Sequence, residues 1–306
     1  MNSFITAMGE SEYLNALFRI LSAPIHENRT TQPSRSIPGL QLRFPLTRDG
    51  ELSLPLLTTK KMSLRIIFGE LAWFIRGDTD VKHLRQDRIH IWDGDTNAQT
   101  LESRKLPYRE YDAGPVYGFQ WRHWNAEYQG CEASYEGKGI DQLAKSLEVL
   151  RTDPFSRRNI VSAWNVGQLN QMALPPCHMN FQWYVGPDDA GKPKFLTCIM
   201  TQRSGDMPLG VPYNIVSYGL LTHMVAKLVG LVPRELVINI GDAHVYQNQI
   251  QECYEQCRRC PKPPPKLKIA GQQTKLEDFK LEDFIVEDYD PAPAIEYKLT
   301  TADKKI

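Results

Sequence analysis

The chain has 306 residues, of which 42% are apolar and 24% charged, and its 36 basic side chains balance its 36 acidic ones. This is the composition of an ordinary soluble protein, and a net charge of zero argues against surface-wide attraction to nucleic acid or membranes. No apolar run approaches the roughly eighteen residues of a membrane-spanning helix, and the N-terminus lacks a basic start followed by a long apolar core. We therefore expect an unprocessed cytoplasmic protein, with nuclear or mitochondrial pools also compatible.

The first half of the chain mixes helical and extended patterns. Residues 11 to 22 place apolar side chains at helical spacing behind Ser11, a possible N-cap, and residues 62 to 76 do the same in a longer run. Between them, residues 40 to 44 alternate apolar and polar side chains as a half-buried strand does. Glu70 falls within the second helix, where spacing alone favours a solvated position over a buried acid with a raised pKa.

Two adjacent arginines stand out in the middle of the chain. A helix is expected over residues 140 to 150 and a strand over residues 160 to 164, with Arg157 and Arg158 directly before the strand. Because strand side chains alternate between faces, one arginine should point away from solvent. Capture of a phosphate and ordinary surface charge are both compatible with the pair.

The second half predicts longer strands. Residues 182 to 185 and 195 to 202 flank a turn rich in glycine and proline and predict a hairpin. Residues 202 to 214 are dense in glycine, proline and polar groups, which is typical of a binding loop. A helix is expected over residues 217 to 229, then a strand over residues 236 to 240. Without regular β-α-β alternation, repeats or long linkers, the pattern predicts an α+β fold in a single domain, residues 1–306.

The six cysteines are too few for a disulfide framework and indicate free thiols in a reducing compartment. Cys177 follows two prolines that fix the backbone and remove amide donors at the mouth of a probable strand. A catalytic thiol and a buried core cysteine both remain open from this stretch alone. Cys253, Cys257 and Cys260 have the spacing of some iron-sulfur sites, but a helical setting without a fourth ligand argues against one.

Eight motifs together resemble the thymidylate synthase family. They occur in the family's order from about residue 13 to about residue 295, and they are closest to its eukaryotic branch. The motifs are Glu70-Leu-Ala-Trp-Phe-Ile-Arg-Gly-Asp-Thr79, Ile91-Trp-Asp93, Gly114-Pro-Val-Tyr-Gly-Phe-Gln-Trp-Arg122, Ser156-Arg-Arg158, Leu174-Pro-Pro-Cys-His178, Gln202-Arg-Ser-Gly-Asp206, Leu209-Gly-Val-Pro-Tyr-Asn214 and Gly241-Asp-Ala-His-Val-Tyr246.

The resemblance implies a large mixed β-sheet flanked by helices, whose face packs against the same face of a second subunit in a homodimer. It implies reductive methylation of dUMP to dTMP by a methyltransferase, with 5,10-methylenetetrahydrofolate as co-substrate for both carbon and hydride, and no metal. A thiolate would add to carbon 6 of uracil and convert the ring into an enolate that attacks an iminium carbon. The implied catalytic residues are Cys177, Glu70, Arg203, Asp206, Tyr117 and His178.

The resemblance also implies two sets of binding residues. Arginines suit a phosphate dianion because their planar guanidinium groups bind it through two hydrogen bonds. The nucleotide set is Arg29, Arg157, Arg158, Gln202, Ser204, Asn214, His244 and Tyr246, with Arg157 and Arg158 donated by the other subunit. The folate set is Lys60, Ile91, Trp92, Asp206, Leu209, Gly210 and Tyr213, with Lys60 as a contact at the rim.

Some features depart from the family pattern. Thr31 and Pro33 stand where the phosphate loop normally carries glycines, and Tyr213 stands in place of the usual phenylalanine. Pro291-Ala-Pro293 replaces a Pro-His-Pro segment, and residues 302–306 extend past the usual end of the chain. Incomplete closure over the folate would let water capture the intermediate, so a pyrimidine nucleotide hydroxymethylase is an alternative. The tryptophan at position 92 favours the synthase, and a non-catalytic member that binds nucleotide or mRNA is a third reading.

Overall fold

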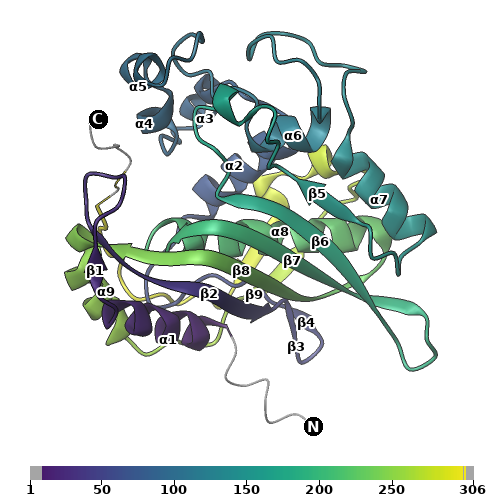
Figure 1. The fold of residues 1–306 in the computed structure, drawn as a ribbon. Coiled ribbons are helices and arrows are strands. Elements are labelled where there is room, and N and C mark those ends of the chain that lie inside the picture. Colours follow the sequence, from purple (N-terminus) through teal and green to yellow (C-terminus); the bar gives the residue numbers. More distant parts are fainter. Residues whose placement is uncertain (1–8, 299, 301–306) are drawn as a thin grey trace.

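The computed structural model describes residues 9–298 and 300, and a six-stranded sheet forms its centre (Figure 1). The strand order is β1-β2-β8-β7-β6-β5. The strands are β1 (Ile25–His26), β2 (Ser34–Pro45), β5 (Ile160–Ser162), β6 (His178–Pro187), β7 (Pro193–Asp206) and β8 (Val232–Tyr246). All neighbours are antiparallel except β7 and β8. The predicted large mixed sheet flanked by helices is confirmed, and so is the hairpin, in which Trp183 pairs with Cys198.

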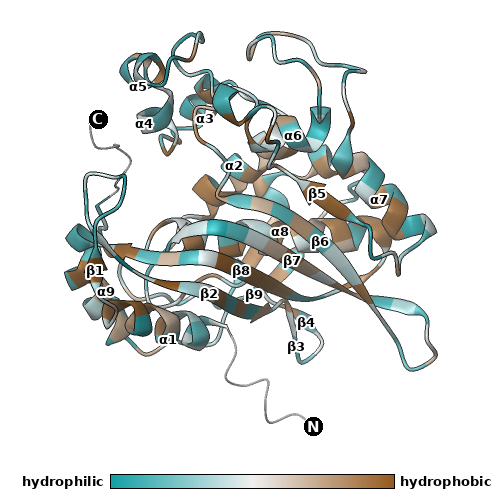
Figure 2. Ribbon diagram, viewed as in Figure 1, coloured by the Kyte–Doolittle hydropathy of each residue, from teal (hydrophilic) through white to brown (hydrophobic). Residues whose placement is uncertain are grey.

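The parallel pair requires a crossover, which the helix α8 (Gly210–Val229) supplies. Its residues from Ile215 to Ala226 are buried, and the helix packs on β7 and β8. Figure 2 shows α8 largely in the brown of apolar residues, behind the sheet. The opposite face of the sheet, turned toward the viewer in Figure 1, has no helix over its centre.

Other helices surround this core. Helix α1 packs on β2 and on α9, and α2 packs on α6 and α8. The helices are α1 (Glu10–Leu21), α2 (Leu64–Ile75), α3 (Val81–Gln86), α4 (Asp93–Thr96), α5 (Ala98–Ser103), α6 (Tyr117–His123), α7 (Gln142–Thr152) and α9 (Ile250–Cys257), with short 3-10 turns at Leu169–Gln171, Gln247–Gln249, Leu276–Asp278 and Leu281–Asp283. Two small hairpins complete the chain, β3 (Thr47–Arg48) with β4 (Glu51–Leu52) and β9 (Lys266–Ile269) with β10 (Phe284–Glu287).

Gly118 allows α6 to approach α2 closely. A Cβ atom at this position would lie 2.4 Å from the backbone oxygen of Phe74, well inside van der Waals contact. The absence of a side chain there brings the ring centroid of Tyr117 to 4.8 Å from that of Phe74. Tyr117, the first residue of α6, is thereby fixed against the last turn of α2. Packing this close allows an aromatic segment to hold a functional side chain in one position.

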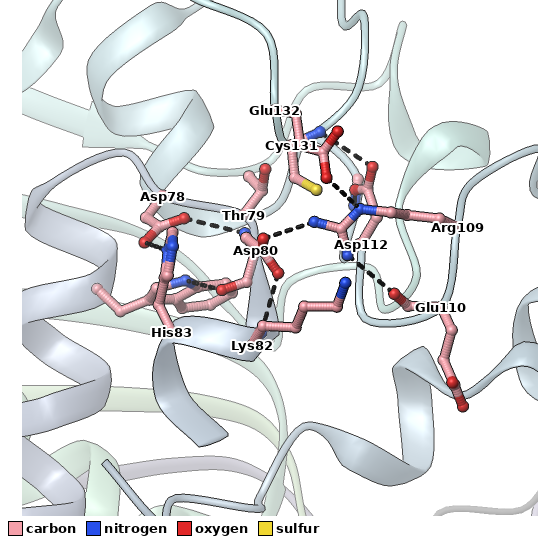
Figure 3. Close-up of polar contacts among 12 residues, drawn as sticks. Asp78, Thr79, Asp80, Lys82, His83, Arg109, Glu110, Asp112, Cys131 and Glu132 are labelled. Carbon is pink, nitrogen blue, oxygen red and sulfur yellow. Dashed lines mark hydrogen bonds and ion pairs between the residues drawn. The ribbon is translucent and has the colours of Figure 1, made fainter. Parts of the chain in front are cut away.

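A polar cluster fixes the segment that precedes Tyr117 (Figure 3). Asp112 accepts hydrogen bonds from the backbone of Gly114 at 2.8 Å and of Cys131 at 3.0 Å, and from the hydroxyl of Tyr128 at 2.6 Å. Arg109 forms an ion pair with Asp80 at 2.5 Å. Both oxygens of this carboxylate thus accept hydrogen bonds, and together they hold two loops in one geometry. Burial raises the pKa of the Cys131 thiol in this cluster to about 12, so the thiol stays protonated.

The structure corrects three expectations. The stretch 202 to 214 is not a loop, since residues 202 to 206 end β7 and residues 210 to 214 begin α8. Pro212 does not oppose this because the first helical turn needs no amide donor there. Arg157 and Arg158 are both exposed, because they lie in a turn before β5 rather than in the alternating strand. The first helix begins at Glu10 with Gly9 as its N-cap, not Ser11.

Candidate active site

A cavity of about 260 Å³ opens where the parallel strands β7 and β8 end and α8 begins. This is where open sheets with a crossover helix usually bind ligands, because the loops diverge and the helix N-terminus faces the gap. Most of the predicted site residues line it, although they come from segments far apart in the sequence. They are Arg29, Glu70, Ile91, Trp92, Tyr117, Cys177, His178, Gln202, Arg203, Ser204, Asp206, Leu209, Gly210, Asn214, His244 and Tyr246.

Arg203 holds the segment that carries Cys177. Its side chain donates from Nε to the carbonyl of Pro176 and from Nη2 to the carbonyl of Pro175, both at 2.9 Å. The same Nη2 lies 3.8 Å from the Sγ of Cys177, and the backbone amide of Arg203 donates to the Cys177 carbonyl at 2.8 Å. The two prolines thus present carbonyls as well as a rigid backbone. One guanidinium group positions the sulfur and places positive charge beside it.

Opposing effects act on the thiol of Cys177. Burial raises its pKa above the ordinary value, while the positive charges of Arg203 and Arg29 lower it and the negative charge of Asp95 raises it. The net direction is upward. The Tyr117 hydroxyl lies next to this residue and accepts a hydrogen bond from the backbone amide of Cys177 at 2.8 Å. The site therefore needs more positive charge near the sulfur to hold Cys177 as a thiolate at neutral pH.

Glu70 faces the cavity from α2. Its Oε1 accepts a hydrogen bond from the indole nitrogen of Trp92 at 2.8 Å. Burial raises the pKa of the Glu70 carboxyl from 4.5 to about 7, and the bond from Trp92 opposes the rise. Spacing alone favoured a solvated position, whereas the structure places Glu70 partly buried on the wall of the cavity. A carboxyl group with this pKa exchanges protons readily near neutral pH.

His178 is buried at the start of β6, next to the cysteine. Its Nδ1 lies 2.8 Å from the hydroxyl oxygen of Tyr218 in α8. Its ring stacks on that of Tyr117 with centroids 4.1 Å apart. Burial lowers the pKa of the imidazole to about 3, so the ring is neutral at physiological pH.

Asp206, the last residue of β7, also lines the cavity. It accepts hydrogen bonds from the backbone amide of Leu209 and from the side chain of Gln249, each at 3.2 Å. Burial raises the pKa of its carboxyl. On the neighbouring strand, the rings of His244 and Tyr246 lie 5.0 Å apart and face the cavity together, as their spacing by two residues predicts.

Comparisons with known proteins show which family the chain belongs to. The family model described as thymidylate synthase matches residues 11–301. The chain belongs to the thymidylate synthase family. It is 47% identical over 296 residues to the thymidylate synthase of Agaricus bisporus, covering 95% of this chain and 99% of that protein. It is 46% identical to that of Saccharomyces cerevisiae over 298 residues and 44% identical to that of Homo sapiens over 293, covering 95% of this chain and 97% and 90% of those proteins.

The resemblance seen in the motifs is thus confirmed, and the chain is a methyltransferase of the thymidylate synthase family. These relatives carry the name of the synthase, and no finding supports a hydroxymethylase. The extension at residues 302–306, which raised that alternative, lies outside the described residues. The described part of the chain does reach the site, because Thr300 borders the cavity and the carbonyl of Lys298 accepts a hydrogen bond from Gln249 at 3.0 Å.

Some predicted residues of the thymidylate synthase site lie elsewhere in this chain. Lys60 is not at the rim: it is buried, its Nζ donates to the carbonyl of Pro208, and it lies 4.8 Å from the ring centroid of Tyr297. Burial lowers its pKa to about 8, while the charge of Asp206 opposes the shift. Tyr213 is partly buried in α8 and does not line the cavity.

The sequence-based prediction missed several lining residues. Asp95 and Arg104 form an ion pair at 3.1 Å beside the cavity, and Thr30, Phe74 and Leu174 border it. Asp95 and Arg104 lie just after the motif around Trp92, so a charged pair close to a motif was the available signal. Phe74 and Leu174 are apolar, and the hydroxyl of Thr30 does not stand out within a polar, turn-rich segment of the sequence. Nothing in the helical pattern of α8 distinguishes Tyr218 from a core tyrosine.

No group of histidine, cysteine and acidic side chains that could hold a metal ion occurs among residues 9–298 and 300. The iron-sulfur spacing at residues 253–260 accordingly forms no such group there. In the same part of the chain, no helix is long and apolar enough to cross a membrane.

Proposed function

We propose that Cys177 is the nucleophile with which this protein methylates dUMP to dTMP, using 5,10-methylenetetrahydrofolate. Membership of the thymidylate synthase family supports the reaction. The geometry around the thiol carries the residue assignment, because Arg203 binds the carbonyls on either side of the Pro175–Pro176 bond and lies beside the sulfur. Attack of the sulfur on carbon 6 moves the C5–C6 electron pair toward the O4 carbonyl. Carbon 5 then attacks the one-carbon unit of the folate.

The other cavity residues receive roles that match their chemistry. Glu70 relays protons, because its raised pKa keeps both of its protonation states populated at neutral pH. The guanidinium groups of Arg29 and Arg203 bind the phosphate. The bound dianion forms an ion pair with the positive charge of Arg203. Asn214 reads the edge of the base, and Asp206 with the apolar wall of Trp92 binds the pterin. Loss of the proton from carbon 5 and cleavage of the bond between the one-carbon unit and the folate nitrogen leave an exocyclic methylene. Hydride from the tetrahydrofolate reduces this methylene to the methyl group as the sulfur leaves carbon 6, which gives dTMP and dihydrofolate.

A covalent adduct tests the assignment. The intact protein incubated with 5-fluoro-dUMP and 5,10-methylenetetrahydrofolate should gain the mass of both on Cys177, because a fluorine at carbon 5 cannot leave as a proton does. Cys177→Ala should give no adduct, whereas Cys260→Ala, which removes an exposed thiol, should react like the wild type. Nucleotide binding without any adduct in the intact protein would instead support the non-catalytic reading.

We further infer a homodimer formed through the open face of the sheet, with residues 1–306 as one catalytic domain in the cytoplasm. Two observations support the dimer. Large apolar side chains project from this face, with Ile160 51% exposed and Tyr184 56% exposed. Ile160 pairs with Gln182, two residues before Tyr184, so Ile160 and Tyr184 share one face. Arg157 and Arg158 are exposed just before β5 and do not line the cavity of their own chain, which fits donation to the phosphate site of a partner.

Subunit complementation tests the donated arginines. One chain carries Cys177→Ala, and the other carries Arg157→Ala together with Arg158→Ala. Each variant should have little or no activity when it is assayed alone. In a mixed dimer one site keeps both the thiol and the arginines, so random mixing should restore about a quarter of the wild-type activity. No recovery after unfolding and refolding the mixture together would contradict donation across the interface.

A further inference from the structure

The hydroxyl of Tyr218 makes one polar contact in the interior of the protein. It lies 2.8 Å from the Nδ1 of His178, and both side chains are almost fully buried, with 2% of Tyr218 and 6% of His178 exposed. Apart from His178, the ring contacts of Tyr218 are with Phe181 and Trp121. Within residues 9–298 and 300, this hydroxyl has no other hydrogen-bond partner. The hydroxyl therefore either donates its single proton to Nδ1 or accepts a hydrogen bond from Nδ1.

The direction of the hydrogen bond follows from the two groups. Burial raises the pKa of the Tyr218 phenol well above its ordinary value, so the hydroxyl keeps its proton. Burial lowers the pKa of His178 to about 3, so the imidazole carries one proton, on either Nδ1 or Nε2. A proton on Nδ1 would leave the buried hydroxyl as acceptor with its own hydrogen unpaired, which is unfavourable. The hydroxyl therefore donates and Nδ1 accepts.

We propose that Tyr218 is a positioning residue that fixes His178 in the tautomer with the proton on Nε2, so that the ring presents a hydrogen-bond donor to the cavity. The stack on Tyr117, with an interplanar angle of 28°, and the contact with Phe74 hold the plane of the ring, and a half turn within this plane would put a carbon in place of Nδ1 and leave the buried Tyr218 hydroxyl without a partner. The Nδ1 edge is occupied by Tyr218, and His178 borders the cavity. The remaining edge therefore serves the ligand.

A proton on Nε2 of His178 has consequences for the reaction, and these consequences rest on the proposed function. An Nε2–H donor favours a carbonyl oxygen of the base, or a water bound to it, over an amino group at that position. His178 cannot accept a proton through Nε2, which leaves the neighbouring Glu70 to relay protons. Cytosine differs from uracil by such an amino group, so Tyr218 contributes to base selection without contacting the base.

Nitrogen-15 NMR of the ligand-free protein tests the tautomer directly. The full chain labelled at histidine has seven imidazole rings, and His178→Gln identifies the signals of His178. At pH 7.5 we expect Nδ1 at the shift of an unprotonated nitrogen and Nε2 at that of a protonated one. The reverse assignment in the wild-type protein would overturn the proposal. This readout requires no substrate, so it stands or fails separately from the adduct on Cys177.

Tyr218→Phe removes the hydroxyl with little change of shape and should move both nitrogen shifts toward a tautomer mixture. Turnover should fall by roughly five- to tenfold, the effect of one hydrogen bond, with little change in KM for dUMP. Tyr135→Phe is the control, since this tyrosine is 8% exposed and does not line the cavity, and its hydroxyl donates to the Gly130 carbonyl at 2.8 Å and accepts from the Gln129 amide at 2.7 Å. Unchanged His178 shifts in Tyr218→Phe, or equal losses in both variants, would refute a positioning role.

Discussion

Replacing Glu70 with glutamine should change how the stability of the protein depends on pH. The pKa of this carboxyl rises from 4.5 to about 7 on burial. A group with a raised folded-state pKa contributes stability that is complete below pH 4.5 and lost as the pH rises through about 7, because the unfolded chain releases its proton first. Proton linkage between these two values gives a loss of about 2.5 kcal/mol from pH 5 to pH 8. Glu70→Gln should escape this loss.

The assay is urea unfolding of the ligand-free protein, followed by circular dichroism at pH 5 and pH 8 and at one protein concentration. The difference in unfolding free energy between Glu70→Gln and the wild type should grow in favour of the variant by about 2.5 kcal/mol over this interval. Glu102→Gln removes an exposed carboxylate and should parallel the wild type. If Glu70→Gln also parallels the wild type, burial does not raise the pKa of Glu70 and its assignment as the proton relay is wrong.

Three further substitutions test the scaffold. Arg203→Ala should slow alkylation of Cys177 by iodoacetamide at pH 8 roughly tenfold, because a charge that favours the thiolate is lost, and an unchanged rate by mass spectrometry would contradict this. Gly118→Ala should destabilise the fold by roughly 2 kcal/mol or more in urea, since the added methyl group meets the backbone of Phe74, and a neutral result would mean that α6 can move aside. Glu10→Ala should cost about 2 to 4 kcal/mol, because the carboxylate accepts four hydrogen bonds from the buried residues at 58 and 59, and Glu10→Gln should recover part of that cost.

The family resemblance carried by the motifs was enough to name most of the residues that line the cavity. Motifs such as Leu174 to His178 and Gln202 to Asp206 combine residue types that ordinary core packing does not require, so they are visible in one dimension. The five predicted strands each overlap a strand of the central sheet, and the first of them, at residues 40 to 44, was predicted from alternation, because a half-buried strand must expose every second side chain. The loop expected over residues 202 to 214 was wrong, since local glycine and proline content cannot show that β7 continues beside β8.

The lysine at position 60 shows a second limit. Its charge suggested a contact at the rim, yet the fold buries its ammonium group against the carbonyl of Pro208 and the ring of Tyr297. These partners lie far away in the sequence, so no local pattern contains them. Burial of a long charged side chain is decided by whether distant backbone oxygens and rings are available to compensate for lost water.

The sequence by itself determined the family, and the motifs of that family pointed to Cys177 as the proposed nucleophile and to most of the polar residues that line the cavity, because the reaction demands particular side chains. Only the tertiary structure decided what state these groups are in. Burial raises the pKa of Glu70 to about 7 and leaves His178 neutral, and a hydroxyl from α8 selects which nitrogen of that ring holds the proton. Protonation depends on which atoms replace water around a group, and those atoms come from parts of the chain that only folding brings together.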